Sequence, residues 1–281
     1  VSADADANDI GIDRGDTVTV NSLIGLDVNG NLTTNGSLSI ASGGSLIVDG
    51  TSTGNITYNR NLGTSNWYLV ASPVTGQDVD DFVTAEVLQE NLPNIALGTT
   101  YNTVDDTWSY YQNGTSNADT FTKGIGYSVN LDGASGDITF TGSMNVADES
   151  VTLAITGNGF NLLGNPYPSY INSATMLTIS TASLLTETIW VWDQSTSSYL
   201  TKVTADSFQL APAQGFFIQS DGAAGSVAIN EAFQSHQSTG TFLKTTLTRP
   251  EVHLTISDGS NTKKARIYYI DGTTTGFDNG Y

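Results

Sequence analysis

Imidazole side chains limit the acid–base chemistry that is open to this chain. The 281-residue sequence holds two histidines, His236 in a polar Gln-Ser-His-Gln-Ser-Thr stretch and His253 in an apolar alternation. A serine nucleophile needs a histidine base, and the Gly-x-Ser-x-Gly turn that presents such a serine in many hydrolases does not occur in the sequence. We therefore expect solvated or structural roles for both histidines, and no enzymatic activity.

Paired carboxylates are the second common catalytic unit, and glycosidases place two of them across a sugar-binding cleft. The six glutamates of the chain are Glu86, Glu90, Glu149, Glu187, Glu231 and Glu251. None of them stands in an aromatic-rich pattern that would form such a cleft. Glu231, at the end of a predicted strand, is best explained as a surface residue.

Two acidic clusters could bind a cation: Asp4, Asp6 and Asp9 in the first, and Asp78, Asp80 and Asp81 in the second. The first cluster places oxygen ligands at nearly alternate positions, as calcium loops do, but it lacks the glycine at the sixth place and the distal glutamate. The second cluster is equally well explained as the first turn of a helix. Calcium is therefore the one cofactor that the sequence suggests.

Aromatic side chains offer platforms on which sugar rings can stack. The candidates for ligand binding are Trp108, Tyr110 and Tyr111 in one segment, and Trp190, Trp192 and Tyr199 in another. Alternation along a strand puts Trp108 and Tyr110 on one face of their sheet, and likewise Trp190 and Trp192. Because both pairs occur in a repeated context, packing inside a core is the simpler explanation.

Composition excludes several classes of function. The formal net charge is −19, so nucleic acid and anionic membranes, which bind clustered Lys and Arg, are not expected as partners. Cysteine is absent, which excludes disulfides, cysteine-ligated zinc and a thiol nucleophile. No apolar run approaches the roughly 20 residues that a spanning helix needs, so we expect no membrane insertion.

The first 57 residues combine an acidic leader with short apolar alternations. From residue 18 to residue 48 these alternations recur at steps of about six to eight residues, separated by Asn-Gly, Gly-Asn and Gly-Gly. Turns that recur this quickly predict the rungs of a small β-solenoid. A meander of hairpins is the competing interpretation, because Asn-Gly is also a strong hairpin signal.

Residues 58–240 contain an internal duplication of about residues 66–145 in residues 159–235. The matching segments are 67–73 with 160–166, 108–110 with 190–192, 126–129 with 215–218, and 136–140 with 225–229, at offsets of 93, 82, 89 and 89 residues. Two such halves of short strands predict one jelly-roll-like β-sandwich, because either half alone buries little surface. Residues 78–92 and 174–185 are the best candidates for short helices.

Residues 241–281 look like the start of a further β-domain. Two alternating segments, 253–256 and 265–270, flank Asp258-Gly259 as a hairpin would, and no closing strand follows them. The predicted fold class is therefore all-β, with solenoid-like rungs, a duplicated sandwich and an incomplete β-segment.

Four blocks carry a resemblance to a known group of proteins. They are residues 67–73 (Trp-Tyr-Leu-Val-Ala-Ser-Pro), 161–168 (Asn-Leu-Leu-Gly-Asn-Pro-Tyr-Pro), 190–193 (Trp-Val-Trp-Asp) and 213–217 (Ala-Gln-Gly-Phe-Phe). Together they resemble the region before the C-terminal sorting domain in large secreted proteins of Bacteroidota, which leave the cell by the type IX secretion system. The resemblance covers nearly the whole chain, and residues 26–50 resemble the repeats that lie upstream in that group. The sorting domain itself, with its terminal lysine-containing strand, is absent from the sequence.

The resemblance implies a secreted or outer cell-surface location, with the type IX secretion machinery as a partner. Asp16-Thr17-Val18 also resembles sites where Bacteroidota attach O-glycans, which would make Thr17 a glycosylation site. The expected function is a non-catalytic structural or adhesive module. The alternatives are a carbohydrate-binding module of a secreted enzyme, with surface polysaccharide as ligand, and a self-assembling subunit of an extracellular fibre, whose open β-segment would accept a neighbouring strand.

Overall fold

The computed structural model describes residues 1–114, 119–133, 135–194, 196–243, 251–257 and 262–268. Strands hold 48% of the residues and helices 10%, so sheets form the core and the predicted all-β class is confirmed. The chain divides into two compact units, residues 1–245 and residues 246–281, and each is described by itself.

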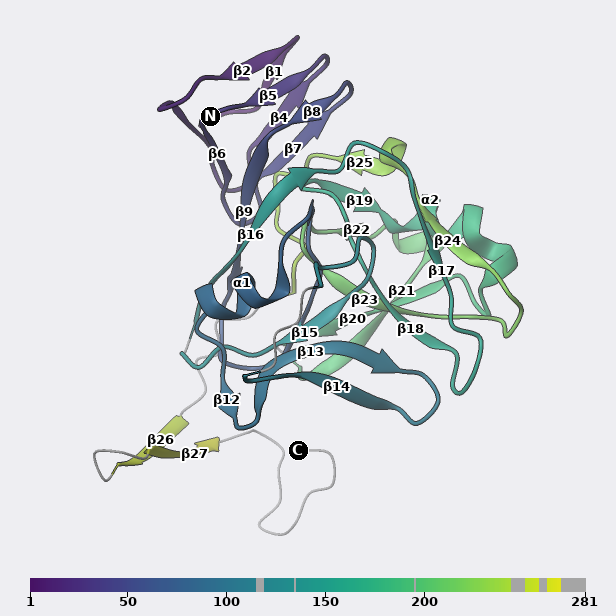
Figure 1. Ribbon diagram of the computed structural model, residues 1–281. Coiled ribbons are helices and arrows are strands. Elements are labelled where there is room, and N and C mark those ends of the chain that lie inside the picture. Colours follow the sequence, from purple (N-terminus) through teal and green to yellow (C-terminus); the bar gives the residue numbers. More distant parts are fainter. Residues whose placement is uncertain (115–118, 134, 195, 244–250, 258–261, 269–281) are drawn as a thin grey trace. The chain divides into compact units, whose positions relative to one another are not determined.

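A three-sided parallel β-solenoid forms the N-terminal part of the first unit (Figure 1). Its strands are β1 (Ala5–Ala7), β2 (Ile10–Ile12), β3 (Thr17–Val20), β4 (Gly25–Val28), β5 (Leu32–Thr34), β6 (Ser37–Ile40), β7 (Ser45–Val48), β8 (Ser52–Thr53) and β9 (Asn55–Leu62). They stack as β1-β4-β7, β2-β5-β8 and β3-β6-β9. Leu26 pairs with Leu46 and Val20 with Ile40, so one turn takes 20 residues. The parallel pairing supports the solenoid interpretation and excludes the meander of hairpins, whose neighbouring strands are antiparallel.

Apolar alternation and close-packed corners explain why these residues form rungs. Leu32, Ile40 and Leu46 point inward from the three faces and are fully buried. At one corner, the Asn31 side chain accepts a hydrogen bond from the Thr51 backbone N–H at 3.0 Å, which ties successive rungs together. Gly54 has a φ of +84°, and a Cβ there would lie 2.0 Å from the Thr34 carbonyl oxygen. Only glycine fits this corner.

The solenoid shares a sheet with the rest of the unit. Strand β9 pairs in parallel with β6 on one side and antiparallel with β16 (Gly136–Met144) on the other. The sheet therefore runs β11-β16-β9-β6-β3, where β11 is Val74–Thr75. One hydrophobic cluster extends from Ile12 in the solenoid to Phe140 on β16. A shared sheet and a shared core join the rungs to the sandwich.

Beyond the solenoid, the unit consists of two halves whose main strands and helix follow the same order. The first half has β9, β10 (Tyr68–Val70), β11, α1 (Val79–Ala85), β12 (Glu90–Asn91), β13 (Asn94–Asn102), β14 (Thr107–Gln112), β15 (Tyr127–Val129) and β16. The second half has β17 (Glu149–Thr152), β18 (Phe160–Gly164), β19 (Tyr170–Asn172), α2 (Ser173–Ser180), β20 (Thr188–Asp193), β21 (Ser198–Val203), β22 (Gln209–Leu210), β23 (Gly215–Gln219), β24 (Ser226–Ile229) and β25 (Gln234–Ser235).

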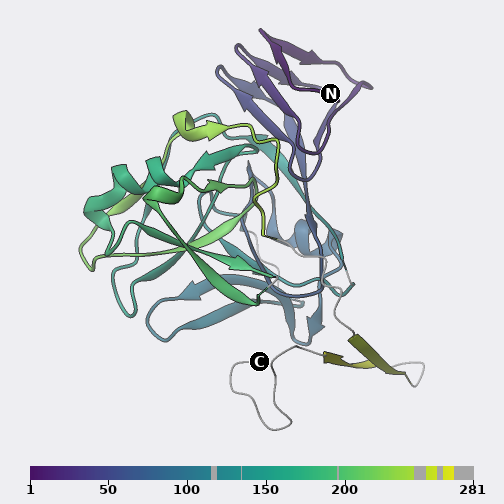
Figure 2. The same ribbon diagram turned by 180° about the vertical axis from the view of Figure 1, so that it is seen from behind.

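Both helices lie where the sequence predicts them, although each is shorter than expected. Asp78 caps α1 by accepting from the Asp81 N–H at 3.0 Å, and Asn172 caps α2 by accepting from the Ala174 N–H at 2.9 Å. Glu86 turns to an extended conformation and ends α1. Helix α2 lies against β24 in the second half (Figure 2).

Each half is a two-sheet sandwich. The sheet β10-β15-β13-β14 of the first half corresponds to β18-β23-β20-β21 of the second, and the pair β9-β16 corresponds to β17-β24. Alternation decides what each side chain faces. On β15, Tyr127 and Val129 point into the core of the first half, and on β23, Phe216 and Ile218 point into the core of the second. The residues between them face the opposite half.

A pseudo-two-fold axis relates the halves. Residues of β10 and β18 correspond at an offset of 93, and those of β15 and β23 at an offset of 89, because Leu69 pairs with Ser128 as Leu162 pairs with Phe217. The isolated bridges obey the same relation. The bridge from β10 to residue 214 has as its counterpart the bridge from β18 to residue 125. The interface is therefore self-complementary, like that of a symmetric dimer.

The closest approach at this axis is between Ala71 and Gly164, which are equivalent positions. The Ala71 N–H donates to the Ala213 carbonyl at 3.2 Å, and the Gly164 N–H donates to the Gly124 carbonyl at 2.9 Å. A Cβ on Gly164 would lie 2.1 Å from the Cβ of Ala71. The axis has room for one methyl group and no more.

The register of the hairpins corrects one part of the sequence alignment. The match of residues 108–110 with 190–192 is wrong by one strand, because β20 corresponds to β13 and not to β14. Tyr101 pairs with Trp108 as Trp192 pairs with Tyr199. The register shift between Gly98 and Thr100 adds one residue to β13, which hides this equivalence in the sequence.

A buried arginine holds three segments of the unit together. Arg60 on β9 is 2% exposed, and its guanidinium donates to the Tyr58 hydroxyl at 2.9 Å and to the Pro212 carbonyl. The same group lies 4.5 Å from the ring centre of Phe242. Within the described residues no carboxylate forms an ion pair with Arg60. The solenoid, the second half and residues 236–243, here called the tail after β25, meet at this one cation.

The second unit contains a two-stranded antiparallel hairpin. Its strands are β26 (Glu251–Ser257) and β27 (Thr262–Tyr268), with Leu254 opposite Ala265. The hairpin was predicted at nearly these positions. Asp258-Gly259 and residues 269–281 lie outside the described residues.

The contact at the pseudo-two-fold axis gives a stability prediction. We expect Gly164→Ala to lower the free energy of unfolding by about 1–3 kcal/mol, because the new methyl overlaps that of Ala71. The double variant Ala71→Gly/Gly164→Ala moves the methyl to the other side of the axis and should recover most of that loss. Urea denaturation of the four proteins of this cycle measures the coupling. A double variant no more stable than Gly164→Ala would contradict the contact.

Candidate functional site

An aromatic pocket lies between the two facing sheets of the halves. Its volume is about 240 Å³, and its lining residues are Trp67, Tyr68, Leu69, Trp108, Tyr110, Ser128, Trp192 and Tyr199. Strands β10, β14 and β15 supply the residues from the first half, and β20 and β21 supply those from the second. The pocket is therefore a product of the packing of the halves.

The rings of the pocket hold each other in fixed orientations. Trp67 lies 5.7 Å from Tyr110 between ring centres, and Trp192 meets Tyr199 edge to face at 4.9 Å. Edge-to-face and tilted pairs are the favoured arrangements of aromatic rings. Trp67 and Tyr199 are also 38% and 45% exposed, so the rings at the mouth remain open to solvent.

The pocket lining carries no charge. Its polar groups are hydroxyls, indole N–H groups and backbone, because no Asp, Glu, Lys, Arg or His lines it. Desolvation, with small contributions from Tyr101 and Asp106, raises the pKa of Tyr199 to about 12. Desolvation also raises the pKa of Tyr68, whose hydroxyl meets the Thr64 side chain at 2.9 Å. Both phenols are therefore neutral hydrogen-bonding groups near pH 7.

One polar atom of a pocket-lining residue has no partner in the described part of the chain. The Nε1 atom of Trp192 is buried and makes no hydrogen bond there. A buried donor without a partner costs about 1–3 kcal/mol.

The structure brings together four of the six aromatic candidates. The pocket is lined by Trp108, Tyr110, Trp192 and Tyr199, whereas Trp190 packs edge to face on Phe160 at 5.1 Å and Tyr111 is not part of the lining. Sequence reasoning missed Trp67 as a pocket residue. No spacing rule could find it, because it precedes β10 and has no aromatic partner at an alternate position of that strand.

The acidic clusters carry backbone hydrogen bonds and caps. Asp4 accepts from the Gly25 N–H and Asp9 from the Asn31 N–H, both at 2.7 Å, so these two carboxylates tie the first rung to the second. Asp6 is exposed on β1.

In the second cluster Asp78 caps α1, and Asp81 supplies the N–H that it accepts. Asp80 accepts from the Tyr111 hydroxyl at 2.8 Å. The described residues contain no group of three or more acidic or imidazole side chains arranged to hold a metal. Calcium binding at either cluster stays a prediction.

His236 lies in a serine–histidine–aspartate cluster that the sequence did not suggest. Its Nδ1 is 2.6 Å from the Ser45 Oγ, and its Nε2 is 3.0 Å from the Asp27 Oδ1, without the alignment of a hydrogen bond. In hydrolases the serine meets Nε2 and the acid meets Nδ1, which is the reverse of this ring. Ser45 is also 1% exposed, so a substrate has no access to it.

The cluster is best explained as an anchor for the tail. The imidazole of His236 covers Gly25, where a Cβ would lie 2.4 Å from the ring. The tail after β25 is thereby fixed on the solenoid flank. His253 belongs to β26, and its side chain lies outside the described residues.

The Asn-Pro-Tyr-Pro block supports the second half. Asn165 is fully buried, and its amide Nδ2 donates to the carbonyls of Ser169, Leu210 and Ala211 at 2.7, 3.2 and 3.1 Å. One side chain therefore fixes two separate loops. The Asn-Pro-Tyr-Pro block, which helps to carry the family resemblance, therefore has a structural role in this chain.

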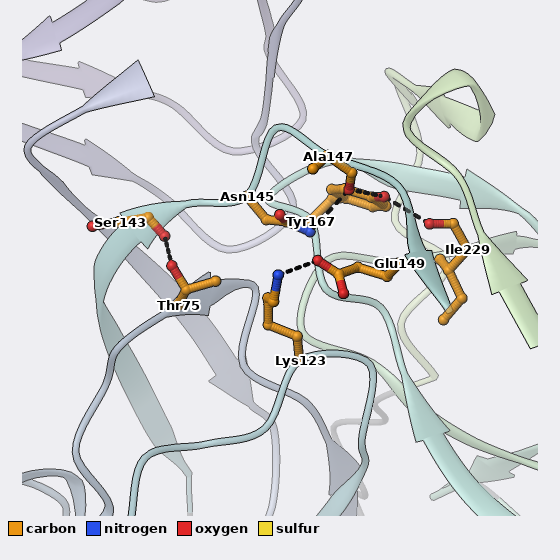
Figure 3. Close-up of polar contacts among 8 residues, drawn as sticks. All are labelled: Thr75, Lys123, Ser143, Asn145, Ala147, Glu149, Tyr167 and Ile229. Carbon is orange, nitrogen blue, oxygen red and sulfur yellow. Dashed lines mark hydrogen bonds and ion pairs between the residues drawn. The ribbon is translucent and has the colours of Figure 1, made fainter. Parts of the chain in front are cut away.

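Tyr167 of the same block joins the linker between the halves to β24 (Figure 3). Its hydroxyl lies 2.8 Å from the Ala147 carbonyl and 2.7 Å from that of Ile229. Burial, and after it the Glu149 carboxylate, raise the pKa of Tyr167, so the hydroxyl keeps its proton. Beside it, the Lys123 ammonium forms an ion pair with Glu149 (Figure 3).

Thr17 is exposed at the start of β3, and its glycosylation stays a prediction. Within the described residues no helix is long and apolar enough to cross a membrane.

The tail anchor generates a prediction. His236→Ala should lower the free energy of unfolding by about 1–3 kcal/mol, because the buried Ser45 hydroxyl loses its partner. Amide exchange in residues 231–243 should rise at the same time. Gly25→Ala, which displaces the ring, is the matched variant and should give the same result. If a fluorophosphonate labels Ser45 in the wild type but not in His236→Ala, the cluster is a hydrolytic site instead.

Comparison with known proteins assigns the chain to a family. No curated protein and no solved structure matches the chain. A family model described as a domain of unknown function, DUF8693, matches residues 1–209. The match includes the solenoid, the whole first half, and the second half as far as β22. The chain belongs to the DUF8693 family.

Proposed function

We propose that this chain is a non-catalytic carbohydrate-binding module of a secreted or cell-surface protein, and that its aromatic pocket holds one neutral sugar ring. The observation that carries the proposal is the convergence of five Trp and Tyr rings with Leu69 and Ser128 on one uncharged pocket.

A sugar ring suits the chemistry of this lining. Pyranose rings present an apolar C–H face that stacks on aromatic rings, and hydroxyls at the rim that bond to groups such as the Tyr110 and Ser128 hydroxyls. Tyr and Trp combine an apolar ring with a polar group, so they can stack on the C–H face of the sugar and also bond to its hydroxyls. Pockets for drug-sized ligands measure about 300–1,000 Å³. At about 240 Å³, this pocket suits a single ring at the end or side of a glycan.

The charge of the chain favours a neutral sugar. The pocket offers no cation to pair with a uronate or a sulfate. The net charge of −19 also repels anionic polysaccharides at long range. A neutral hexose or pentose brings no anionic group that would stay unpaired in the pocket, and the net charge of the chain does not repel it.

The export part of the proposal rests on the resemblance to substrates of the type IX secretion system. A solenoid fused to a sandwich through one sheet would make a stiff support for display at a cell surface. We expect the gene to encode a C-terminal sorting domain beyond Tyr281, and the intact protein to be found outside the cell. A full-length reading frame without such a domain, together with an intracellular protein, would end this part of the proposal.

Glycan binding gives the decisive prediction. On an array of neutral and acidic glycans, we expect the wild type to bind neutral structures only. Trp108→Ala and Trp192→Ala should each weaken binding by about tenfold or more, because an aromatic contact contributes about 0.5–1.5 kcal/mol beyond its buried area.

Trp190→Phe is the matched control for these variants. This tryptophan packs on Phe160 outside the pocket, so its replacement should leave affinity within about twofold. Absence of binding to every glycan, or equal losses in all three variants, would refute the proposed function.

A further inference from the structure

The two halves differ sharply in the side chains that they turn toward each other. In the second half, Leu162, Phe217 and Trp190 lie side by side on β18, β23 and β20. In the first half, the equivalent row on β10, β15 and β13 is Leu69, Ser128 and Gly98. Two large aromatic residues of one half thus correspond to a serine and a glycine of the other.

Phe217 and Trp190 fill the space on their side of the pseudo-two-fold axis. The Phe217 ring meets Tyr101 edge to face at 4.9 Å and Tyr199 at 5.7 Å. Trp190 closes on Phe160 at 5.1 Å. These two rings stand at the positions that Ser128 and Gly98 hold in the first half.

Ser128 and Gly98 leave the equivalent space open on the other side. Ser128 lines the pocket. A Cβ on Gly98 would lie 2.2 Å from the Ser128 Oγ and 2.7 Å from the Trp108 ring. Trp108 therefore rests directly on Gly98 and forms one wall. A larger residue at either position would close the pocket or displace that wall.

We infer that Ser128, with Gly98 beside it, determines the pocket, and that each chain holds one open sugar site whose counterpart in the second half is closed by Phe217 and Trp190. The inference deepens the proposed function and rests on it for the identity of the ligand. The duplication gives the interface two equivalent places, and the difference at two positions leaves one of them open. Ser128 is also the only non-aromatic polar side chain of the lining, so it is the specificity-determining contact for a sugar hydroxyl.

The absence of cysteine allows a direct test of the open pocket. Ser128→Cys and Val129→Cys place single thiols on neighbouring positions of β15 whose side chains face opposite ways. Both parent residues are buried, at 4% and 0% exposure, but only Ser128 lines the pocket. We expect methyl methanethiosulfonate to modify Ser128→Cys at least tenfold faster than Val129→Cys under native conditions. Equal rates would overturn the inference.

A filling variant tests the link to binding. Ser128→Phe introduces the residue type that the second half has at this position, and it should weaken binding of the best array glycan at least tenfold. For the wild type, calorimetry should give one glycan bound per chain. Binding within twofold of wild type, or two glycans per chain, would overturn the inference. Melting temperature and near-UV circular dichroism establish that the variant is folded. If it does not fold, the two thiol variants decide the matter alone.

The two failures can be told apart. A reactive thiol at position 128 that no glycan protects supports the open pocket and refutes the sugar ligand. Protection of that thiol by the array glycan supports both claims.

Discussion

The close approach of residues 71 and 164 is the constraint on which the arrangement of the two halves depends. Because the backbones meet where one residue has a methyl group and its equivalent has none, the sheets can face each other at only one distance. The paired hydrogen bonds on either side of this point fix the orientation as well. Packed interfaces of this kind do not deform gradually. Every contact between the facing sheets, including the aromatic pocket, follows from this geometry.

The pocket illustrates how a duplicated fold can acquire one site. The sandwich cores need large apolar residues in both halves, and residues such as Tyr127 and Phe216 satisfy this need equally. The face between the halves is less constrained. A small side chain on one half leaves space there, and that space can stay open or be filled by a side chain of the other half. Ser128 and Phe217 occupy equivalent positions on that face and differ completely in size. Function on this fold therefore depends on a few substitutions at the internal interface.

Local pattern was enough to predict the elements, and pairing was not. Short alternations with glycine corners predicted the rungs, and Asp78 with its acidic neighbours predicted α1, because both signals lie within a few residues. The duplication was visible because Gly126 and Gly215 keep their place in each half. The hairpin match failed because a bulge at Gly98 shifts the register, and bulges leave no fixed mark in a single sequence. Several aromatic residues of the pocket could be named from the sequence, but their convergence could not, since Trp108 and Tyr199 belong to different halves that meet only through the pseudo-two-fold packing. The roles of Asp4 and Asp9 were equally hidden, because their partners lie in the next rung.

The buried Arg60 has a consequence for the order of assembly. Two of its partners, Pro212 and Phe242, are made more than 150 residues later than Arg60 itself. Until they are made, the guanidinium can stay in water, and the flank of the solenoid that His236 covers remains open. Contacts this distant in sequence slow folding, because a long loop must close before they form. The solenoid and the sandwich would therefore reach their final packing only after residue 242 has been released from the ribosome.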